Sequence, residues 1–556
     1  MHRALSAIAV AIFLSVPALR AQYKPGPQVL TFFSSVDDSE QPYALYLPKD
    51  FSSAKRYPLV MMLHGAYSNH RLALRRVFGK GNRPGENDIE ATRYFPPLPD
   101  VEYIVAAPLA RGTLGYQGIP EKDVMDVMSD VESRFAVDPD RVYLTGLSMG
   151  GGGALWIGLT HPDIWAAIAP VCAAPPPHTA DLAPNALDLA VHFFQGGADP
   201  VVPVQQTRDW VSRLKAMETK DVEYNEYPGV KHNSWDNAYA NAEIFEWLGH
   251  YKRDLWPRRV RFASLDYEHR KAYWVVLDRL MPGTLASIDA QFTGPNQIEV
   301  KTSALRGFTL ALFHHPNFEA GKPLAVTIDG RSVNVPPITS NVSFAKRNAG
   351  WRIGDASPDD GEKQAGAEGP LVRAFSDRHV YVFGTNDHPA KEELAKRREQ
   401  AVQDAAWAPL GVRLELWLRT VADKDVRPSD WKSSDLILLG TKDTNSIVAG
   451  LSNELPMELS GQPSGWNLTY IWPHQNHYVV VSSGDGLGAQ GQHMWAPWIP
   501  VTNFIAAVYS LPDYGLFHNG QKVIEGRFDE HWKILAADAE KLKNSGVVTL
   551  RKGAVQ

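Results

Sequence analysis

Short apolar runs alternate with longer amphipathic stretches over the first half of the chain. Residues 57–63 and 142–147 are mostly apolar and are bounded by polar or glycine residues. Residues 191–194 repeat this pattern, whereas residues 222–227 alternate apolar and polar positions. Runs of this length predict strands, and the stretches between them are long enough for helices. The region from about residue 27 to 256 therefore predicts an α/β fold with a mostly parallel sheet and flanking helices.

The pattern changes beyond residue 260. Short apolar runs there are separated by turn residues such as Gly294, Pro295 and Asn296, and they predict strands at 273–277, 287–292, 297–302, 308–313 and 325–328. We therefore expect a small β-rich domain over residues 260–350. The stretch 355–369 is rich in Asp, Gly and Glu, which predicts a mobile linker.

A second α/β pattern follows this stretch. Strands are predicted at 379–383, 435–439 and 477–482, and helices at 390–407, 445–451 and 501–509. Alternation of strands and helices predicts a smaller three-layer α/β domain over residues 370–535. Between residues 65 and 102 of the first domain lies a long excursion, which we expect to wall a functional site.

A serine stands at the turn between the strand that ends at residue 147 and a glycine-rich predicted helix. Gly146, Ser148 and Gly150 form the pattern Gly-x-Ser-x-Gly. Such a turn strains the serine backbone and brings strand and helix close together, so the flanking residues must be small. It also places the hydroxyl at a helix N-terminus, where a developing negative charge is stabilised. Ser148 is the candidate nucleophile, and a plain glycine-rich turn is the alternative.

Candidate partners for this serine follow along the chain. Asp199 comes just after the run 191–194, at the carboxyl end of a predicted strand, where open α/β sheets place their functional residues. His232 lies in the loop after the run 222–227. The order Ser148, Asp199, His232 is the order of the α/β-hydrolase fold and differs from that of chymotrypsin or subtilisin. In such a triad the histidine takes the serine proton and the aspartate orients the imidazole.

Acyl transfer by a serine also needs donors for a transient oxyanion. Two preorganised backbone N–H groups usually supply them. Met149 follows the nucleophile, and Ala66 lies in the loop after the strand 57–63. We expect these two amides to form the oxyanion hole, with Tyr67 as the alternative second donor. His64, in the same loop, is expected to be structural.

These motifs resemble those of secreted α/β-hydrolases of the esterase kind. Residues 27–256 are similar to polyhydroxybutyrate-depolymerase-like, feruloyl-esterase-like and prolyl-oligopeptidase-family serine hydrolases. The whole chain also resembles bacterial proteins labelled prolyl-oligopeptidase-family serine peptidases, in which such a domain carries a long C-terminal extension. The resemblance implies the fold and the triad, and it leaves the substrate open. It rests on residues 63–65, 107–112, 138–151 and 196–203.

The resemblance implies a serine hydrolase that cleaves carboxylic esters through an acyl-enzyme, with feruloyl or acetyl esters of plant polysaccharide as candidate substrates. One alternative is a prolyl-oligopeptidase-like peptidase. That family normally carries a propeller before its hydrolase domain, and we expect none before Tyr23, which favours the esterase. The other alternative is a non-catalytic binding protein with a relic hydrolase domain, and the complete set of Ser148, Asp199 and His232 argues against it. Oligomeric state stays open.

The N-terminal residues, the net charge and the cysteine count bear on the location and the binding partners of the protein. Arg3, an apolar run over 4–16 and Ala21 predict a secretory signal peptide over residues 1–21, hence a secreted or periplasmic protein. A net charge of −6 gives no reason to expect nucleic-acid binding. We expect no cofactor, no metal and no membrane span. Cys172 is the only cysteine, which excludes an intramolecular disulfide and predicts a small buried residue.

Aromatic residues are dense near the C-terminal end. Such side chains more often pack inside the protein. Stacking on sugar rings, which would suit an esterase of plant polysaccharide, is the alternative. The residues in question are Trp466, Tyr470, Trp472, Trp495 and Trp498.

Overall fold

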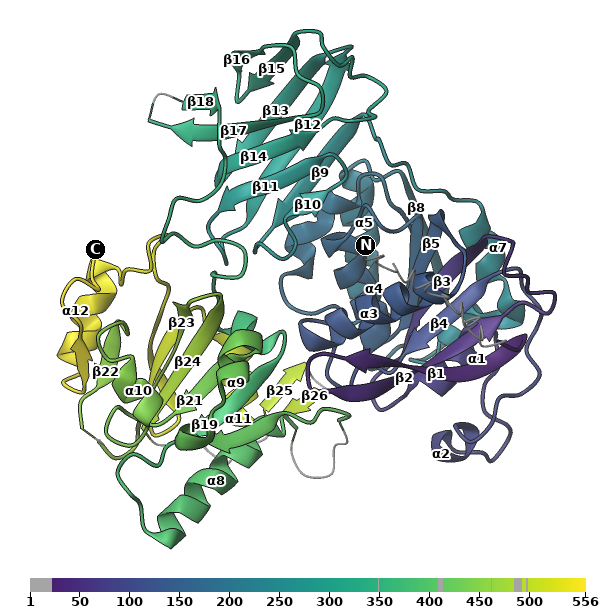
Figure 1. Cartoon of the computed structure of the whole chain (residues 1–556). Helices are drawn as coiled ribbons and strands as arrows, with labels where there is room; N and C mark the ends of the chain where they lie inside the picture. Colours follow the sequence, from purple (N-terminus) through teal and green to yellow (C-terminus); the bar gives the residue numbers. More distant parts are fainter. Residues whose placement is uncertain (1–22, 349, 409–413, 462, 485–492, 497–498) are drawn as a thin grey trace, which may run out of the picture.

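The computed structural model contains three units, each built on its own sheet or pair of sheets, and Figure 1 shows them as three lobes. The predicted signal peptide lies outside the described residues. Within those residues, every helix is too short or too polar to cross a membrane. The described residues are 23–348, 350–408, 414–461, 463–484, 493–496 and 499–556.

An eight-stranded sheet forms the centre of the N-terminal unit, in the order β1-β2-β4-β3-β5-β6-β7-β8. The pairs β1–β2 and β2–β4 are antiparallel, and all the other pairs are parallel. The sheet is thus mostly parallel, as predicted. Its strands are β1 (Gly26–Ser34), β2 (Ser39–Leu47), β3 (Tyr57–Leu63), β4 (Ile104–Pro108), β5 (Val137–Leu147), β6 (Ala167–Val171), β7 (Ala190–Gly196) and β8 (Asp221–Tyr227).

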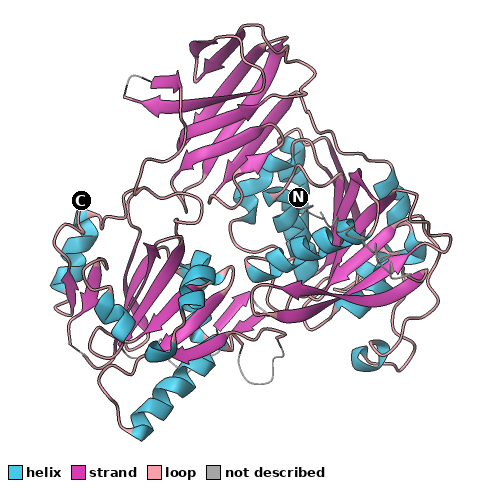
Figure 2. Ribbon diagram, in the orientation of Figure 1, coloured by secondary structure: helices cyan, strands magenta, loops and turns pink. Residues whose placement is uncertain are grey.

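Helices cover both faces of this sheet (Figure 2). Alternate residues of a strand enter different cores: Met61 packs with one set of helices, and its neighbour Met62 packs with the other. Burial on both faces explains why the strands are continuous apolar runs in the sequence. One face carries α3 (Ile119–Arg134), α4 (Met149–Thr160) and α5 (Val204–Ala216), and the other carries α1 (His70–Val77) and α7 (Ile244–Gly249). Shorter helical segments are α2 (Asp88–Ala91), η1 (Thr179–Ala186), α6 (Trp235–Ala238) and η2 (Ala240–Ala242).

The middle unit consists of two five-stranded sheets that enclose one apolar core. Their orders are β10-β11-β14-β17-β18 and β16-β15-β13-β12-β9. The five predicted strands correspond to β11–β15, whereas the other five strands were not predicted. The strands are β9 (Arg259–Ser264), β10 (Lys271–Ala272), β11 (Val275–Leu280), β12 (Ala286–Gly294), β13 (Gln297–Ser303), β14 (Leu305–Ala311), β15 (Leu324–Ile328), β16 (Arg331–Val335), β17 (Asn341–Arg347) and β18 (Gly350–Ile353).

A seven-stranded mixed sheet organises the C-terminal unit, in the order β20-β19-β21-β24-β23-β27-β28. The three strands predicted from sequence are β19, β21 and β24, which lie next to one another and pair in parallel. The sheet strands are β19 (His379–Phe383), β20 (Arg419–Ala422), β21 (Asp435–Leu439), β23 (Trp466–His474), β24 (His477–Gly484), β27 (Tyr514–His518) and β28 (Gln521–Gly526).

Helices and two small strand pairs complete this unit. The three predicted helices correspond to α8, α10 and α11. The strand pairs are β22 (Met457–Leu459) with β29 (Val548–Leu550) and β25 (His493–Ala496) with β26 (Ile499–Val501). The helical segments are η3 (Leu371–Phe375), α8 (Lys391–Ala405), η4 (Asp423–Asp425), α9 (Pro428–Ser433), α10 (Ser446–Gly450), α11 (Asn503–Ser510) and α12 (Ala536–Asn544).

The stretch 355–369 is anchored, so the prediction of a mobile linker was wrong. Lys363 forms an ion pair of 2.5 Å with Asp513, and both side chains are only 1% exposed. Glu368 is also buried and accepts a hydrogen bond from the Tyr267 amide. Charged side chains predicted a solvated segment, and here they make partnered contacts inside the protein.

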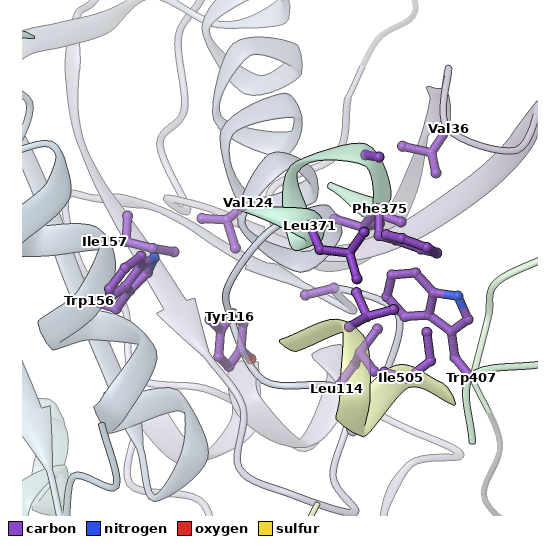
Figure 3. Close-up of a cluster of buried hydrophobic side chains, with 14 of the residues drawn as sticks. Val36, Leu114, Tyr116, Val124, Trp156, Ile157, Leu371, Phe375, Trp407 and Ile505 are labelled. Carbon is purple, nitrogen blue, oxygen red and sulfur yellow. The ribbon is translucent and has the colours of Figure 1, made fainter. Parts of the chain in front are cut away.

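One apolar core runs from the N-terminal unit into the C-terminal unit (Figure 3). Leu114 and Tyr116, which follow β4, belong to the same buried cluster as Phe375 and Trp407. Ile505 of α11 lies in this cluster as well. The two units therefore share buried apolar surface and are not joined only by a tether.

A buried arginine ties the same two units by polar contacts. Arg111 is fully buried, and its guanidinium pairs with Asp37 at 2.6 Å and with Asp123 at 2.7 Å. It also donates to the backbone carbonyl of Glu415 in the C-terminal unit at 3.0 Å. Burial raises the pKa of Asp123 to about 6, although the charge of Arg111 acts in the opposite direction.

Arg111→Met should destabilise the protein by about 3–5 kcal/mol, because it leaves two buried carboxylates without their cation. Arg378→Met is the matched control, since Arg378 pairs with Asp38 between the same two units while that carboxylate is 53% exposed. The control substitution should lower the free energy of unfolding by about 1 kcal/mol or less. Urea unfolding of both variants measures the difference, and equal losses would contradict the role given to Arg111.

Candidate active site

The turn that carries Ser148 is tightly packed. Ser148 lies between β5 and α4 with φ 56° and ψ −116°, a backbone conformation that residues other than glycine rarely adopt. A Cβ atom on Gly146 would lie 2.2 Å from the carbonyl oxygen of Gly150, and a Cβ atom on Gly150 would lie 2.3 Å from that of Leu63. Only glycine fits at both positions, so the sequence pattern follows from the contact between β3, β5 and α4.

Asp199 and His232 are brought together by the loops after β7 and β8. The amides of Gly197 and Ala198 donate to the carbonyls of Tyr227 and Val230, which connects the two loops. These neighbouring parallel strands therefore deliver the carboxylate and the imidazole to the same edge of the sheet as Ser148.

The three side chains form a continuous hydrogen-bond chain. The His232 Nε2 atom lies 2.9 Å from the Ser148 Oγ atom, and the His232 Nδ1 atom lies 2.8 Å from the Asp199 Oδ2 atom. The Asp199 side chain is fully buried, whereas that of His232 is 21% exposed. In this geometry Nδ1–H donates to the carboxylate and Nε2 can accept the serine proton.

Asp199 is held as an ionised acceptor. Its Oδ1 atom accepts hydrogen bonds from the amides of Val201 and Val202, and its Oδ2 atom accepts a further one from Gln195 at 3.0 Å. Burial opposes ionisation, but the hydrogen bonds from His232 and from the two amides outweigh it and lower the pKa of Asp199. The carboxylate is therefore charged at neutral pH and can stabilise an imidazolium.

The predicted oxyanion loop passes directly beside the serine. A Cβ atom on Gly65 would lie 3.5 Å from the Cβ atom of Ser148. The Tyr67 amide donates to the Thr113 hydroxyl at 2.7 Å, whereas the Ala66 amide donates to no group of the described chain. Met149 is the first residue of α4, where helical amides have no partner within the helix. Of the three candidate amides, those of Ala66 and Met149 have no partner within the described residues, and that of Tyr67 has one.

His64 and Tyr116 brace this loop from inside the protein. The His64 ring nitrogens lie 2.7 Å from the carbonyl oxygen of Gly65 and 2.8 Å from that of Leu109. The Tyr116 hydroxyl donates to the carbonyl of His64 at 3.0 Å. Burial lowers the pKa of His64. These contacts fit the structural role that the sequence suggested for His64.

The excursion between residues 65 and 102 supplies α1 and α2 and approaches the triad. The Arg76 guanidinium of α1 lies over the Trp235 ring at 5.3 Å, and Trp235 contacts the His232 ring edge-on at 5.4 Å. Arg76 is also paired with Asp88 of α2 at 3.2 Å. The excursion thus reaches the aromatic side chain that packs beside the candidate base.

Sequence reasoning missed Gln195, Thr113 and Tyr116. Gln195 lies near the carboxyl end of the buried strand β7, and its side chain also binds the Val202 carbonyl and the Thr207 hydroxyl. A polar residue at the end of a buried strand is the signal that could have identified it, because buried polar groups need partners. No comparable sequence signal marks the other two.

Two further predictions concern residues outside the triad. Cys172 is buried, as predicted, and burial raises the pKa of its thiol to about 12. The described C-terminal aromatics serve packing. Trp472 contacts two other aromatic rings, Tyr470 is buried, and Trp466 stacks on His518 at 4.4 Å. Trp498 and the side chain of Trp495 lie outside the described residues.

Comparison with known proteins agrees with this architecture. Residues 123–245 match the model of the Phospholipase/Carboxylesterase family. Acyl-protein thioesterase 1 of Mycosarcoma maydis is 33% identical over 116 residues, which cover 20% of this chain and 48% of that protein. Poly(3-hydroxybutyrate) depolymerase of Ralstonia pickettii is 39% identical over 69 residues, or 12% of this chain and 13% of that protein. A thermostable esterase of known structure is 27% identical, with a TM-score of 0.33, over 41% of this chain and 63% of that one.

The matches cover less than half the length of both curated relatives. The family-model match, residues 123–245, falls within the N-terminal unit, where the mostly parallel sheet and its helices lie. The mostly parallel sheet and the family-model match show that the N-terminal unit has the α/β-hydrolase fold and is similar to esterases. The fold class predicted for this region is confirmed.

Ser148→Gly should be more stable than Ser148→Ala by about 1 kcal/mol or more, because only glycine relieves the backbone strain at this turn. Both variants lack the hydroxyl, so their difference isolates the Cβ atom. Thermal unfolding of the two variants measures it. A glycine variant less stable than the alanine variant would show that the turn is not strained.

Proposed function

We propose that the chain is a serine hydrolase that cleaves carboxylic esters through an acyl-enzyme. The observation that carries this proposal is the hydrogen-bond chain from Asp199 through His232 to Ser148, with the free amides of Ala66 and Met149 beside the serine. Nucleophile, base, orienting carboxylate and oxyanion donors are the parts that acyl transfer to serine requires.

In the proposed reaction His232 takes the proton of Ser148 as the serine oxygen attacks the ester carbonyl. The carbonyl oxygen becomes an oxyanion and accepts hydrogen bonds from the amides of Ala66 and Met149. His232, now an imidazolium stabilised by Asp199, gives its proton to the departing alkoxide, which leaves as an alcohol. The acyl group stays on Ser148.

Water completes the cycle. His232 takes a proton from the water molecule, whose oxygen attacks the acyl carbonyl through a second oxyanion. Collapse of this intermediate returns the proton to Ser148 and releases the carboxylic acid. Partial exposure of His232 on an otherwise buried triad supports this step, because water can reach the imidazole.

Substrate choice and location are part of the proposal. We propose small carboxylic esters as substrates, with feruloyl and acetyl esters of plant polysaccharide as the first to test, and secretion directed by residues 1–21. A panel of p-nitrophenyl acetate, methyl ferulate, acetylated xylan and a proline-containing peptide separates esterase from peptidase action. Hydrolysis of the peptide in preference to every ester would contradict the proposal.

Ser148→Ala and His232→Ala should each reduce ester turnover to a similar residual level, and the double variant should be little worse. The reason is that nucleophile and base act in one step, so losing either one removes the same contribution. Steady-state rates on p-nitrophenyl acetate test this. If the two losses multiplied in the double variant, His232 would not be the base for Ser148.

Asp199→Asn should lower kcat by about 10³–10⁴-fold with the fold intact, because the amide favours the wrong imidazole tautomer. Asp188→Asn is the matched control. Asp188 is another largely buried aspartate that precedes the same strand, β7, at its opposite end, and burial raises its pKa to about 6. Its variant should retain near wild-type turnover. Comparable losses in both variants would show that a change in fold, and not the triad, causes the effect.

A further inference from the structure

The geometry points to a binding site for a divalent cation of the zinc type, formed by Glu121, His161 and His269. The site lies between the N-terminal and middle units, away from the triad in the sequence. Glu121 belongs to α3, His161 follows the last residue of the nucleophile helix α4, and His269 lies in the loop between β9 and β10.

Two imidazoles converge on one carboxylate oxygen. The Nε2 atoms of His161 and His269 lie 3.0 and 2.9 Å from the same Oε1 atom of Glu121. All three candidate donor atoms lie within 4.8 Å of one another. Two ligands on a tetrahedral zinc ion with bonds of about 2.0 Å are about 3.3 Å apart, so each imidazole needs to move away from the Glu121 oxygen by only a few tenths of an ångström.

A second layer of contacts orients these candidate ligands. The Nδ1 atom of His269 lies 2.9 Å from a carboxylate oxygen of Asp266, which leaves Nε2 directed at the site. The Trp156 indole donates to the other oxygen of Glu121 at 2.7 Å, so the carboxylate keeps Oε1 toward the two imidazoles, where the Thr160 hydroxyl also donates to it at 3.4 Å. A carboxylate behind a ligating histidine is the usual support of a metal site.

The charge of the cluster favours a cation. Glu121 and the His269 side chain are almost fully buried, and within the described chain Glu121 has no arginine or lysine partner. The Asp266 carboxylate adds a second negative charge beside His269, with its two oxygens 2.9 and 3.2 Å from the Nδ1 atom.

A second group of potential metal ligands differs, because arginines already pair with its carboxylates. Glu362, Glu530 and His531 also lie close together, but Arg279 pairs with the first carboxylate and Arg306 with the second. A cation is already supplied there by the protein. At Glu121 the corresponding positions are taken by two imidazoles, which can exchange their Nε2 protons for a metal ion.

Two imidazole nitrogens and one carboxylate oxygen suit Zn²⁺ better than Mg²⁺ or Ca²⁺, which prefer oxygen ligands. With three protein ligands, a water molecule completes a tetrahedral shell. The bound ion fastens the β9–β10 loop to α3 and to the end of α4, so it stabilises the contact between the two units.

The test uses the untagged full chain, stripped with EDTA, dialysed and titrated with ZnCl₂. We expect one zinc per chain by elemental analysis after gel filtration, and a thermal midpoint that rises by several degrees and falls again with EDTA. MgCl₂ should give no rise. His161→Gln should abolish the zinc-dependent rise, and since this side chain is 23% exposed, the variant should fold.

His178→Gln is the matched control, because His178 is 71% exposed and its one partner among the described residues is Asp181. It should bind zinc like the wild type. Asp266→Asn should weaken zinc binding by about 10–100-fold, as expected for a residue that orients a ligand. Zinc content and thermal midpoint that are equal in the wild type and His161→Gln would overturn the proposal and leave the cluster as a proton-held ion-pair network.

Discussion

The close approach of β3, β5 and α4 at Ser148 is the contact on which the rest of the site depends. Because residues 146 and 150 are glycines, a neighbouring carbonyl oxygen can lie only 2.2 to 2.3 Å from the point where a Cβ atom would stand. This contact fixes the strained serine at the carboxyl edge of the sheet and sets the Met149 amide at the start of the helix. The loops after β7 and β8 then need only reach the same edge. Parallel neighbouring strands guarantee that they do, because their carboxyl ends coincide.

The C-terminal unit supports the oxyanion loop through a series of buried contacts. Tyr116 holds the carbonyl of His64, and therefore the loop of Ala66, while its neighbour Leu114 packs in the core that Phe375 and Trp407 share. A chain of packed side chains thus leads from the C-terminal unit to one proposed oxyanion donor. The buried Arg111 adds polar contacts to the same junction. The extension is in this respect part of the scaffold that supports the site.

The sequence predicted those features that are encoded locally. The apolar runs matched the buried strands of the N-terminal sheet, and the turn of Ser148 is recognisable because sterics demand glycine there. Features that arise from tertiary contacts were missed. Polar composition suggested a mobile segment at 355–369, but Lys363 in this segment forms a buried ion pair with Asp513, which is distant in the sequence. Strands such as β16 and β20, of five and four residues, are too short to stand out as a pattern. Glu121 and His269 lie 148 residues apart, so no spacing motif links them.

Ser148 is proposed to be an activated nucleophile, because its hydroxyl is hydrogen-bonded to His232, which in turn is hydrogen-bonded to Asp199. Labelling of the native full chain with a fluorophosphonate, followed by mass spectrometry of its peptides, tests this claim most directly. The account predicts a single adduct on Ser148, formed far more slowly in the His232→Ala variant. Absence of labelling in the wild type, or an adduct on a different residue, would contradict it.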